Sequence, residues 1–596
     1  MRASWRRTGR AWGIILVIAI LAVLPIALNQ VGILGVDSYF QYNRIYEAEM
    51  QLRHANFSFL NLYSFQQAGR IVNQVYSPLL TVIFGAILLV AGNWFKFQVI
   101  SMILVNFIAG ISMYYGAKRL KFSFGICVAL AGIYLSSFSI YGFVYSTSWR
   151  ALAVAFVPLL IGPMVDFYRG NWSTREMLAL GIIIAIIAQA QIISAALVLP
   201  ALVPFFVIGL IKTKEKWRAL ARLGLAILLA LLLSLNVVLP YLELLQGSHL
   251  LPPTNLPLIN GVTNAIVPYS DHSSPLSIAI ISLFFYVALA TLVLFWRKLS
   301  GFARTLTVVS LIYLILGTNV IPWTVIGTQW PALESYLQLP RRFIIAGLSF
   351  LLASDVLIVH ELRAQQLFHW TQSGIALTVT MLAIAGVSSL AVTSATLVAR
   401  QSDPNTSIAA GLATNDNNVY AHRYRGKQIK KITDLQPVFH VRDKSALVRV
   451  VDRRTPDYVP IKGAYSTKND YYSAYVRYVI APKSNFKHQV LPGGVLQLTW
   501  RQKKAHQINV PVVVYGNTQV NLNNKALAHT GLKTSLISTP TVQGKKGINQ
   551  IRLSYQPKML TLIGIWWSVL AWGVVVIALI WRGWLKHREI KQSEVD

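Results

Sequence analysis

The chain has 596 residues, of which 55% are hydrophobic and only 13% charged, and its mean hydropathy is +0.52. Soluble chains carry roughly twice that share of charge. Several apolar runs approach or exceed the roughly 18 residues that cross the hydrocarbon core of a bilayer. The composition therefore predicts a polytopic α-helical membrane protein and excludes a soluble enzyme, a disordered protein and a disulfide-rich secreted domain. The single cysteine, Cys127, allows neither a disulfide nor a cysteine-based metal site within one chain.

The formal net charge is +33. Basic chains often bind nucleic acid, but here the charge lies in short loops between apolar runs and in residues 401–558. That hydrophilic region holds 24 Lys and Arg against 7 Asp and Glu, a net charge of +17. A basic region beside a membrane predicts an anionic partner, such as lipid headgroups or a polyphosphate polymer, and no nucleic acid.

Both ends of the chain carry predicted membrane anchors. An apolar run at 11–28 follows a basic N-terminal decapeptide, and the last run, 559–580, precedes aromatic and basic residues typical of a cytoplasmic end. The region between 401 and 558 is therefore expected outside. The predicted organisation is a transmembrane domain at 1–400 with a first outer loop at 35–76, an extracytoplasmic basic domain at 401–558, a final helix at 559–581 and a cytoplasmic tail at 582–596.

Eleven further apolar runs lie between the two anchors. Placing the basic clusters between them inside gives a consistent alternation except at 77–92, which has only sixteen residues and begins with Ser77-Pro78. We expect this run to lie in the outer leaflet as a juxtamembrane helix, which leaves about twelve spans with both termini inside. The eleven runs are 77–92, 97–117, 122–141, 150–167, 177–191, 192–211, 219–240, 276–296, 305–317, 343–360 and 373–396.

Two kinds of structure are expected outside the spans. Residues 38–54 are predicted as an amphipathic helix capped by Asp37. The 401–558 domain is predicted as mostly β and sandwich-like, with a hairpin at Asn523-Asn524. Its main strands are expected at 447–451, 471–480, 494–500, 508–515 and 548–555.

Charged residues close to the membrane are rare and therefore informative. Asp37 follows the first span, where its carboxylate is suited to act as a general base or to hold a metal that binds a phosphate; the alternative is a helix N-cap with no further role. Arg44 and Glu47 lie three apart on one helix face, either as a surface ion pair or as a wall of the site opened by Asp37. Arg70 follows Gly69 in a polar outer loop, where it would meet a phosphate.

Two arginines at the outer mouth of a late span, Arg341 and Arg342, run against the positive-inside tendency. Phosphate binding through their guanidinium forks explains them, and snorkelling to lipid headgroups is the alternative. Gln189, Gln191 and Ser194 lie at the tip of a tight apolar hairpin, where they either bind a polar ligand or cap the break between two short helices. The sequence contains no P-loop, dinucleotide fingerprint, HExxH or Gly-x-Ser-x-Gly motif, so it gives no indication of ATP hydrolysis, redox chemistry or zinc.

Three segments together resemble one family. The stretch GVDSYFQYNRIYEAEMQLRHANFSFLNLYSFQQAGRIVNQVYSPLL resembles the first outer loop of the YfhO-like bacterial membrane proteins, which overlap with the family described as 6-pyruvoyl-tetrahydropterin synthase-related, membrane domain. LQLPRRF is similar to the Gln-aromatic-Pro-x-Arg-Phe pattern of that family, with Arg342 on the arginine position. VVVYGNTQVNLNNKAL and GKKGINQIRLSYQP, followed by a final span, look like its terminal β-domain.

The resemblance implies a GT-C-like fold and a glycosyltransferase that uses a polyprenyl-phosphate-linked sugar on the outer face of a bacterial plasma membrane. Asp37 matches the acidic position of the first outer loop, which serves as base or as ligand of a divalent cation, Mg²⁺ or Mn²⁺. Arg342, with Arg341, matches the arginine that holds the carrier phosphate. The family is implicated in adding sugars to the teichoic acids of Gram-positive bacteria, an anionic acceptor that the basic 401–558 domain would suit.

Two departures from the family bear on catalysis. No acid occurs at 142–149, where the family often carries a Gly-Glu pair, and Gln191 stands where it often has a histidine. We therefore carry three hypotheses. The first is a glycosyltransferase in which Asp37 acts as base or metal ligand, Arg341 and Arg342 bind phosphate, and Arg44, Glu47, Arg70 and Gln191 shape the site. The second is a non-catalytic scaffold that binds an envelope polymer or a partner glycosyltransferase, and the third is a lipid flippase or transporter.

Overall fold

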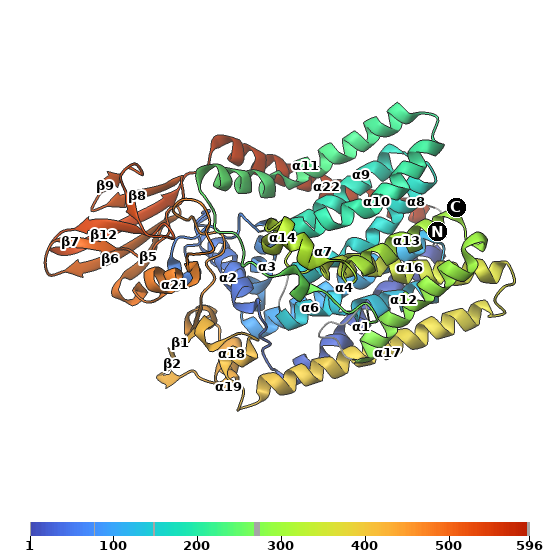
Figure 1. The fold of residues 1–596 in the computed structure, drawn as a ribbon, viewed down its shortest axis with the longest axis horizontal. Coiled ribbons are helices and arrows are strands. Elements are labelled where there is room, and N and C mark those ends of the chain that lie inside the picture. The colour runs from blue at the N-terminus through green and yellow to red at the C-terminus, as the bar shows by residue number, and fades with distance from the viewer. Residues whose placement is uncertain (1, 77, 147–148, 268–274, 593–596) are drawn as a thin grey trace.

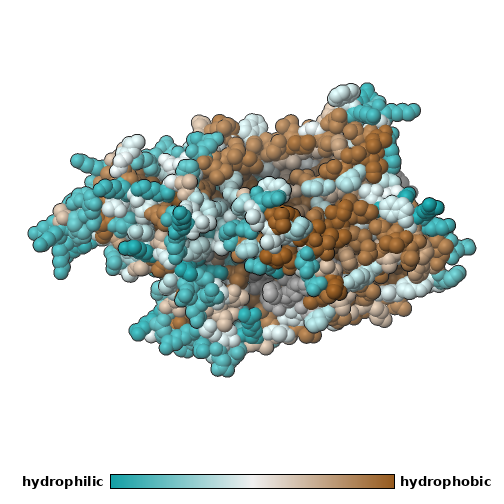
Figure 2. All heavy atoms as spheres, viewed as in Figure 1, coloured by the Kyte–Doolittle hydropathy of each residue, from teal (hydrophilic) through white to brown (hydrophobic). Residues whose placement is uncertain are grey.

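The computed structural model describes residues 2–76, 78–146, 149–267 and 275–592. The molecule is elongated: long helices form one part and bring both chain termini to its far end, whereas the strands gather at the opposite end (Figure 1). Apolar side chains cover much of the visible surface of the helical part, and hydrophilic side chains cover the end with the strands (Figure 2). A hydrophobic helical part and a separate hydrophilic part are what the composition predicts for a multi-pass membrane protein.

Within the described residues, nine helical segments are long and apolar enough to cross a membrane. The elements that form them are α1 (Arg2–Asn29), α4 (Trp94–Arg119), α7 (Trp149–Ala155) with η2 (Val157–Leu160) and α8 (Ile161–Tyr168), α10 (Ile192–Lys212), α11 (Lys216–Gly247), α12 (Pro275–Phe295) with η4 (Trp296–Lys298), α16 (Arg342–Ala364), α17 (Gln372–Ser402) and α22 (Met559–Gln592).

The number of full-length spans is lower than the predicted twelve because some of the expected spans are broken or short. α5 (Phe124–Leu135) and α6 (Phe138–Ser146) make one segment that bends by 52°, which raises the number to ten. α9 (Thr174–Ala190) has 17 residues and α13 (Gly301–Leu316) has 16, so both fall just below the length of a full span. All twelve predicted spans are thus helical, but some of these helices are too short or too bent to cross a membrane as one straight helix.

α3 (Pro78–Ala91) covers the segment that the sequence assigned to the membrane surface. It has 14 residues, too few to span, and it packs against α2 (Ser38–His54). The approach is close at Gly85, where an added Cβ would lie 2.8 Å from the Cβ of Ala48. Glycine is therefore required there for the two helices to touch.

A polar network inside the helical part joins α9, α11 and α22. Gln189 Nε2 donates to the carbonyl oxygen of Leu233 over 2.8 Å and to Asn236 Oδ1 over 2.5 Å. The Ser568 hydroxyl donates to the same two oxygens over 2.9 Å, and Trp572 Nε1 donates to Leu233 O. Buried hydrogen bonds of this kind hold membrane helices together where burial of apolar surface cannot. Gln189 therefore serves packing and does not bind a ligand at the hairpin tip.

The hydrophilic part begins after α17 with small helices and short strands, and it continues into two antiparallel sheets. The first sheet has five strands in the order β5-β6-β12-β8-β9 and the second has three in the order β10-β11-β7. The elements are α18 (Ile408–Gly411), η5 (Asp416–Asn418), β1 (Val419–Ala421), β2 (Arg423–Tyr424), β3 (Lys427–Gln428), α19 (Ile432–His440), α20 (Ser445–Val450), β4 (Val451–Arg453), α21 (Tyr471–Tyr475), η6 (Val476–Ile480), η7 (Lys483–Asn485), β5 (Lys487–Leu491), β6 (Val495–Gln502), β7 (His506–Asn509), β8 (Thr518–Leu522), β9 (Lys525–Leu527), β10 (Lys533–Thr534), β11 (Pro540–Gly544) and β12 (Gly547–Tyr555).

The predicted strands near 494–500 and 548–555 and the hairpin are confirmed. β6 and β12 pair along their lengths, and β8 and β9 join through Asn523 and Asn524, whose φ values of 50° and 69° suit a tight hairpin turn. Leu496 and Leu553 of the larger sheet and Val542 of the smaller sheet belong to one buried core. The two sheets therefore share one core, in a separate β-sheet region near the C-terminus.

Of the predicted strands, two are wrong in part and one, 471–480, is wrong throughout. Residues 447–450 belong to helix α20, and only Val451–Arg453 form a strand. Residues 471–480 are helical because Asp470 caps the segment, accepting from the Ser473 amide over 2.9 Å, and because Tyr471 and Tyr475 share a buried face one turn apart. The 508–515 segment leaves its strand after Asn509. The 401–558 region is thus α+β in its first half and β in its second.

The first outer loop is built into this hydrophilic part. Leu60, Leu62, Ala68 and Ile71 lie in the same buried core as the two sheets, and the short helix η1 (Phe65–Gln67) lies between Leu62 and Ala68 in the chain. The remaining elements, η3 (Leu258–Gly261), α14 (Trp323–Gln329) and α15 (Ala332–Tyr336), lie in the segments that connect the late helices. Leu251, in the segment that follows α11, belongs to the core of the two sheets as well. Three stretches far apart in sequence therefore meet at one end of the helical part: the first loop, residues 248–267 after α11, and the 401–558 region.

Candidate functional site

Asp37 ends the turn that precedes α2, as the sequence predicts, and its side chain is exposed. It occupies the N-cap position but makes no side-chain hydrogen bond to the first turn of α2. The Asp37 carboxylate therefore does not act as a simple helix cap. The carboxylate instead acts electrostatically on three groups that come from elsewhere: Tyr76, Arg453 and Asp457.

Asp457 supplies a second carboxylate beside Asp37. It is half-buried; Tyr472 donates its hydroxyl to Oδ1 over 3.0 Å, and Arg70 donates Nη2 to its backbone oxygen over 2.6 Å. Burial raises the pKa of Asp457 and the charge of Asp37 adds to the rise, while Tyr472, Arg70 and Arg453 oppose it. A carboxyl group whose pKa is raised by burial and by a neighbouring carboxylate is typical of sites that handle protons.

Arg453 brings a cation within electrostatic range of both acids. Burial lowers its pKa, and the charges of Asp37 and Asp457 oppose that fall. Sequence reasoning missed both Arg453 and Asp457. The sequence does carry a signal for Asp457: acidic residues are rare in 401–558, and Asp457 is one of only seven there.

An aromatic wall stands beside the acids. The rings of Tyr76 and Tyr458 meet edge to face with centroids 5.4 Å apart, and Phe40 packs on Tyr76 at 5.1 Å. Burial raises the pKa of Tyr76 and Tyr458 well above the ordinary tyrosine value, so both hydroxyls stay protonated at neutral pH. Aromatic faces of this kind suit the apolar faces of a sugar ring or the chain of a lipid.

Arg44 is fully buried behind this wall. Its guanidinium lies 4.9 Å from the ring centroid of Tyr76 and donates to Gln41 Oε1 over 2.9 Å and to Thr81 Oγ1 over 2.7 Å. Burial contradicts a surface ion pair between Arg44 and Glu47, which was one of the two predicted roles. Arg44 supports the wall from behind and ties α2 to α3.

Glu47 is also fully buried, and its carboxylate holds the first loop. It accepts from the backbone amides of Leu62 and Tyr63 over 2.8 Å, from the amide and hydroxyl of Ser64 over 3.0 and 2.9 Å, and from Gln51 Nε2 over 2.9 Å. Five donors leave this carboxylate no capacity for a substrate. Glu47 therefore shapes the site only through the loop that it fixes.

Arg70 joins the first loop to the 401–558 region. Besides its bond to Asp457 O, it donates to Thr455 Oγ1 over 3.2 Å and to the Tyr475 hydroxyl over 3.5 Å, and it stacks on Phe65 at 4.9 Å. The side chain is fully buried. The predicted contact with a free phosphate is therefore replaced by a structural contact that positions Asp457.

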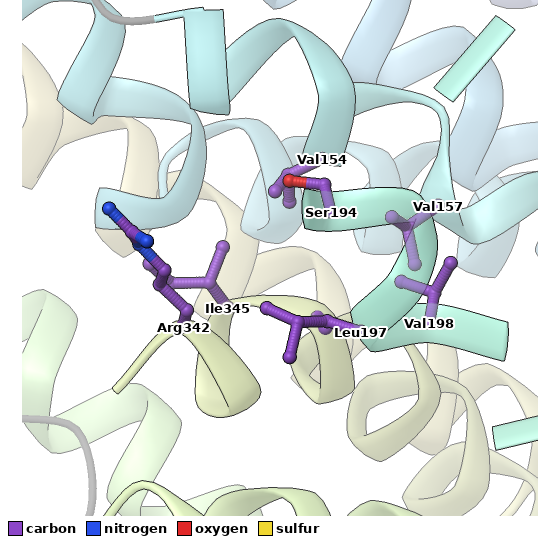
Figure 3. Close-up of a pocket in the computed structure, with 8 residues that line it drawn as sticks. Val154, Val157, Ser194, Leu197, Val198, Arg342 and Ile345 are labelled. Atoms are coloured by element: carbon purple, nitrogen blue, oxygen red, sulfur yellow. The ribbon is translucent and has the colours of Figure 1, made fainter. Parts of the chain in front are cut away.

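Arg342 lies at the start of α16 and donates to the backbone oxygens of Tyr336 and Leu337 over 3.1 and 2.7 Å and to Gln338 Oε1 over 3.2 Å. Arg341, the preceding residue, donates its backbone amide to Gly261 O over 3.0 Å. Arg342 also borders a cavity of about 10 Å³, with Ser194, Leu197 and Val198 of α10 on its other side (Figure 3). That volume holds about one water molecule and no sugar.

Gln191 lies at the break between α9 and α10, and its Oε1 accepts the hydroxyl of Ser194 over 2.7 Å. Because Ser194 borders the same small cavity as Arg342, the hairpin tip and the predicted phosphate-binding arginine do come together.

A continuous set of hydrogen bonds links Arg342 to the acids. Arg342 bonds to the Gln338 carboxamide, whose Nε2 donates to Thr254 O over 2.9 Å, and the Thr254 hydroxyl bonds to the Tyr472 hydroxyl. Tyr472 donates in turn to Asp457. The predicted phosphate arginine, Arg342, and Asp457 are thus parts of one polar structure, joined through Thr254 in the segment after α11.

Metal binding at Asp37 was one predicted role. In the part of the chain that the structure describes, no three or more His, Cys, Asp and Glu side chains are grouped so that they would hold a metal ion. Asp37 and Asp457 are a pair, which matches the one or two carboxylates through which Mg²⁺ usually binds beside phosphates.

No protein-family model and no curated protein matches this chain in sequence. The resemblance to the YfhO-like family therefore stays a prediction that depends on the three motifs quoted above. The structure adds the fold and the geometry of the site.

Proposed function

We propose that the chain is an extracytoplasmic glycosyltransferase of GT-C type that moves a sugar from a polyprenyl-phosphate carrier to an anionic cell-envelope polymer such as teichoic acid. One observation carries the proposal. The Asp37 carboxylate is exposed, makes no cap bond with α2 and lies within electrostatic range of Arg453 and Asp457. A carboxylate beside a cation and a second acid offers the groups that a transfer away from a phosphate needs: a base, and a positive charge for the departing oxyanion.

In this mechanism Asp37 takes the proton from the acceptor hydroxyl as the hydroxyl oxygen bonds to the sugar C1. The bond between C1 and the phosphate oxygen breaks, and its electron pair leaves with the polyprenyl phosphate. Arg453, with Arg341 and Arg342, stabilises that charge. Asp457 provides the second carboxylate that the sequence lacks at 142–149, and Arg44, Glu47, Arg70 and Gln191 shape the site without touching the reacting atoms.

A divalent cation, Mg²⁺ or Mn²⁺, is the other proposed role for Asp37. Asp37 and Asp457 would hold it, and it would offset the charge of the carrier phosphate. Loss of transfer in EDTA with recovery on adding Mg²⁺ or Mn²⁺ identifies that role, and transfer unaffected by EDTA assigns Asp37 as base.

The positions of the chain ends support an outward-facing site. Both termini lie at the end of the helical part away from the strands (Figure 1), and the N-terminal decapeptide carries four arginines and no acid. The positive-inside rule assigns such an end to the cytoplasm. Asp37 would then face outward from a bacterial plasma membrane, where Gram-positive teichoic acids lie.

A non-catalytic envelope scaffold is the second candidate. It is favoured by the burial of Arg44, Glu47 and Arg70, whose polar atoms serve the packing of the first loop. A flippase is the third candidate and predicts lipid-linked sugar flux in vesicles without transfer.

The test compares the sugar content of purified teichoic acids from wild-type cells, a deletion strain and the deletion complemented with Asp37→Asn or Asp416→Asn. Asp416 is an exposed acid of η5 and serves as the matched control for loss of one charge. We expect the control to restore the sugar and Asp37→Asn to lower the rate of its addition about 100-fold or more. Restoration by Asp37→Asn would contradict the assigned role of Asp37, and unchanged sugar in the deletion strain would contradict the proposed acceptor.

A further inference from the structure

A second, larger cleft opens on the other side of β4 from Asp37. Its volume is about 450 Å³, and it lies between the turn Tyr63–Gln67 of the first loop and residues of the 401–558 region. Asp452 and Arg453 are neighbours in β4, and successive side chains of a strand point to opposite faces. Asp452 lines this cleft, whereas Arg453 interacts with Asp37.

Asp452 is the acidic residue among those that line the cleft, and its negative charge is already paired with donors from the cleft. His422 Nε2 donates to its Oδ2 over 2.6 Å, Gln66 Nε2 donates to Oδ1 over 3.0 Å, and the Lys483 ammonium forms an ion pair with Oδ2. Burial would raise the pKa of Asp452, but these three donors outweigh it and hold the pKa below its ordinary value. Asp452 therefore remains ionised and fixes His422, Gln66 and Lys483 in place.

Arg449 brings a cation to the cleft. Its side chain is exposed and lines the cleft, and among the described residues it donates no hydrogen bond and forms no ion pair. With Lys483 balanced by Asp452, the cleft keeps the positive charge of Arg449. A guanidinium fork that faces an open cleft is suited to two oxygens of a phosphate.

The floor of the cleft is a strained turn. Phe65, Gln66 and Gln67 have φ values of 48°, 60° and 52°, a left-handed conformation that residues other than glycine rarely adopt. Asn43 Oδ1 accepts from the Phe65 amide over 2.8 Å and Glu47 holds the residues just before it, so the surrounding structure enforces the turn. Strain of this kind gathers at binding sites, and here it directs Gln66 at Asp452 and leaves amide and hydroxyl groups along the cleft.

We propose that this cleft binds a phosphate-bearing polyol, one segment of an anionic envelope polymer, with Arg449 on the phosphate and the amide and hydroxyl side chains of the cleft on the polyol. The assignment of that polymer as the acceptor rests on the proposed function. The binding itself does not.

Position makes the cleft suitable for an acceptor. Gln66 accepts the Tyr475 hydroxyl over 2.7 Å, that hydroxyl accepts from Arg70, and Arg70 donates to Asp457 O. A single polar path thus runs from Asp452 in the cleft to Asp457 beside Asp37.

The experiment measures calorimetric binding of a synthetic glycerol phosphate hexamer to the full-length protein in nanodiscs of zwitterionic lipid. Three proteins are compared: wild type, Arg449→Gln and Arg477→Gln. Arg477 is an exposed arginine of η6 that packs on Tyr478 and does not line the cleft, so it controls for loss of one positive charge. We expect Arg449→Gln to weaken binding about tenfold or more and Arg477→Gln to change it less than twofold.

The other arms separate the sources of phosphate. If both variants lost the same amount of affinity, binding would reflect attraction to the basic surface alone, and the proposal would be overturned. It would also be overturned if the wild-type protein did not bind the hexamer, or if Arg449→Gln bound it with wild-type affinity. Competition by phosphatidylglycerol in the nanodisc would reassign the cleft to a lipid headgroup, and inorganic phosphate binding as tightly as the hexamer would remove the polyol from the proposal. The assay contains no sugar donor, so its result is independent of whether Asp37→Asn abolishes transfer.

Discussion

Tyr472 donates its hydroxyl to Asp457 Oδ1 over 3.0 Å, and the charge of Asp37, at the start of α2, acts on the same carboxyl group. The tyrosine also bonds to the Thr254 hydroxyl, which belongs to the path from Arg342. The Tyr472 hydroxyl thus links the predicted phosphate arginine, Arg342, to Asp457, an acid that the sequence reasoning missed.

Replacing Tyr472 by Phe tests whether this bond matters for transfer. Loss of the donated hydrogen bond should raise the pKa of Asp457 further, since that bond lowers it. We expect transfer to fall about tenfold, the value of one hydrogen bond to a charged group, and its acidic limb to move to higher pH in a rate profile. Tyr478→Phe is the control, because Tyr478 is half-buried beneath Arg477 and away from the acids. An unmoved acidic limb in Tyr472→Phe would count against Asp457 as a member of the site.

Glu47→Gln should destabilise the protein, because a carboxamide cannot accept from all five donors that the carboxylate now satisfies. We expect a loss of about 2 kcal/mol or more in the free energy of unfolding, measured by denaturation of the detergent-solubilised protein. Glu215→Gln, which removes an exposed partner of Arg218, should cost less than about 1 kcal/mol. A Glu47→Gln protein as stable as the control would show that the first loop does not depend on this carboxylate.

Glu243 attaches the sheets to the helical part. It is buried at the end of α11 and accepts from Asn517 Nδ2 and the Tyr555 hydroxyl over 2.8 Å and from the Lys558 amide over 3.1 Å. In Glu243→Gln we expect the junction to open more often, with trypsin cleavage after Lys558 about tenfold faster, which corresponds to about 1.4 kcal/mol. Time courses of limited proteolysis measure this rate. The same acceleration in Glu215→Gln would mean that the effect is not specific to the junction.

Asp452 predicts a pH dependence of stability. Its pKa in the folded protein is lower than its ordinary value near 4, so its stabilising contribution is fully present above that ordinary value and is lost as the pH falls through the folded pKa. The free energy of unfolding of the wild type should therefore drop below about pH 4 by more than that of Asp452→Asn, whose side chain does not titrate. Denaturation curves at several pH values between 3 and 6 give the difference. Parallel curves for the two proteins would contradict the depressed pKa.

Local features were predictable because neighbours in sequence decide them. Long apolar runs must form helices in a bilayer, since only a helix satisfies their backbone groups internally. The hairpin at Asn523-Asn524 follows from turn chemistry. The predicted strand at 471–480 failed because its apolar residues suit either period, and the Asp470 cap with the buried pair Tyr471 and Tyr475 favours the helix.

The sequence by itself determined a chain of apolar helices with a basic, strand-rich region before the last one, and it singled out Asp37 as the acid that follows the first helix. Only the tertiary structure decided that Arg453 and Asp457 stand beside Asp37, that Asp452 faces a second cleft, and that Arg44, Glu47 and Arg70 are buried. The physical reason is the range of the interactions. Helix length, caps and turns depend on residues a few positions apart, whereas the meeting of residues some 400 positions apart depends on how the first loop packs into the core of the sheets.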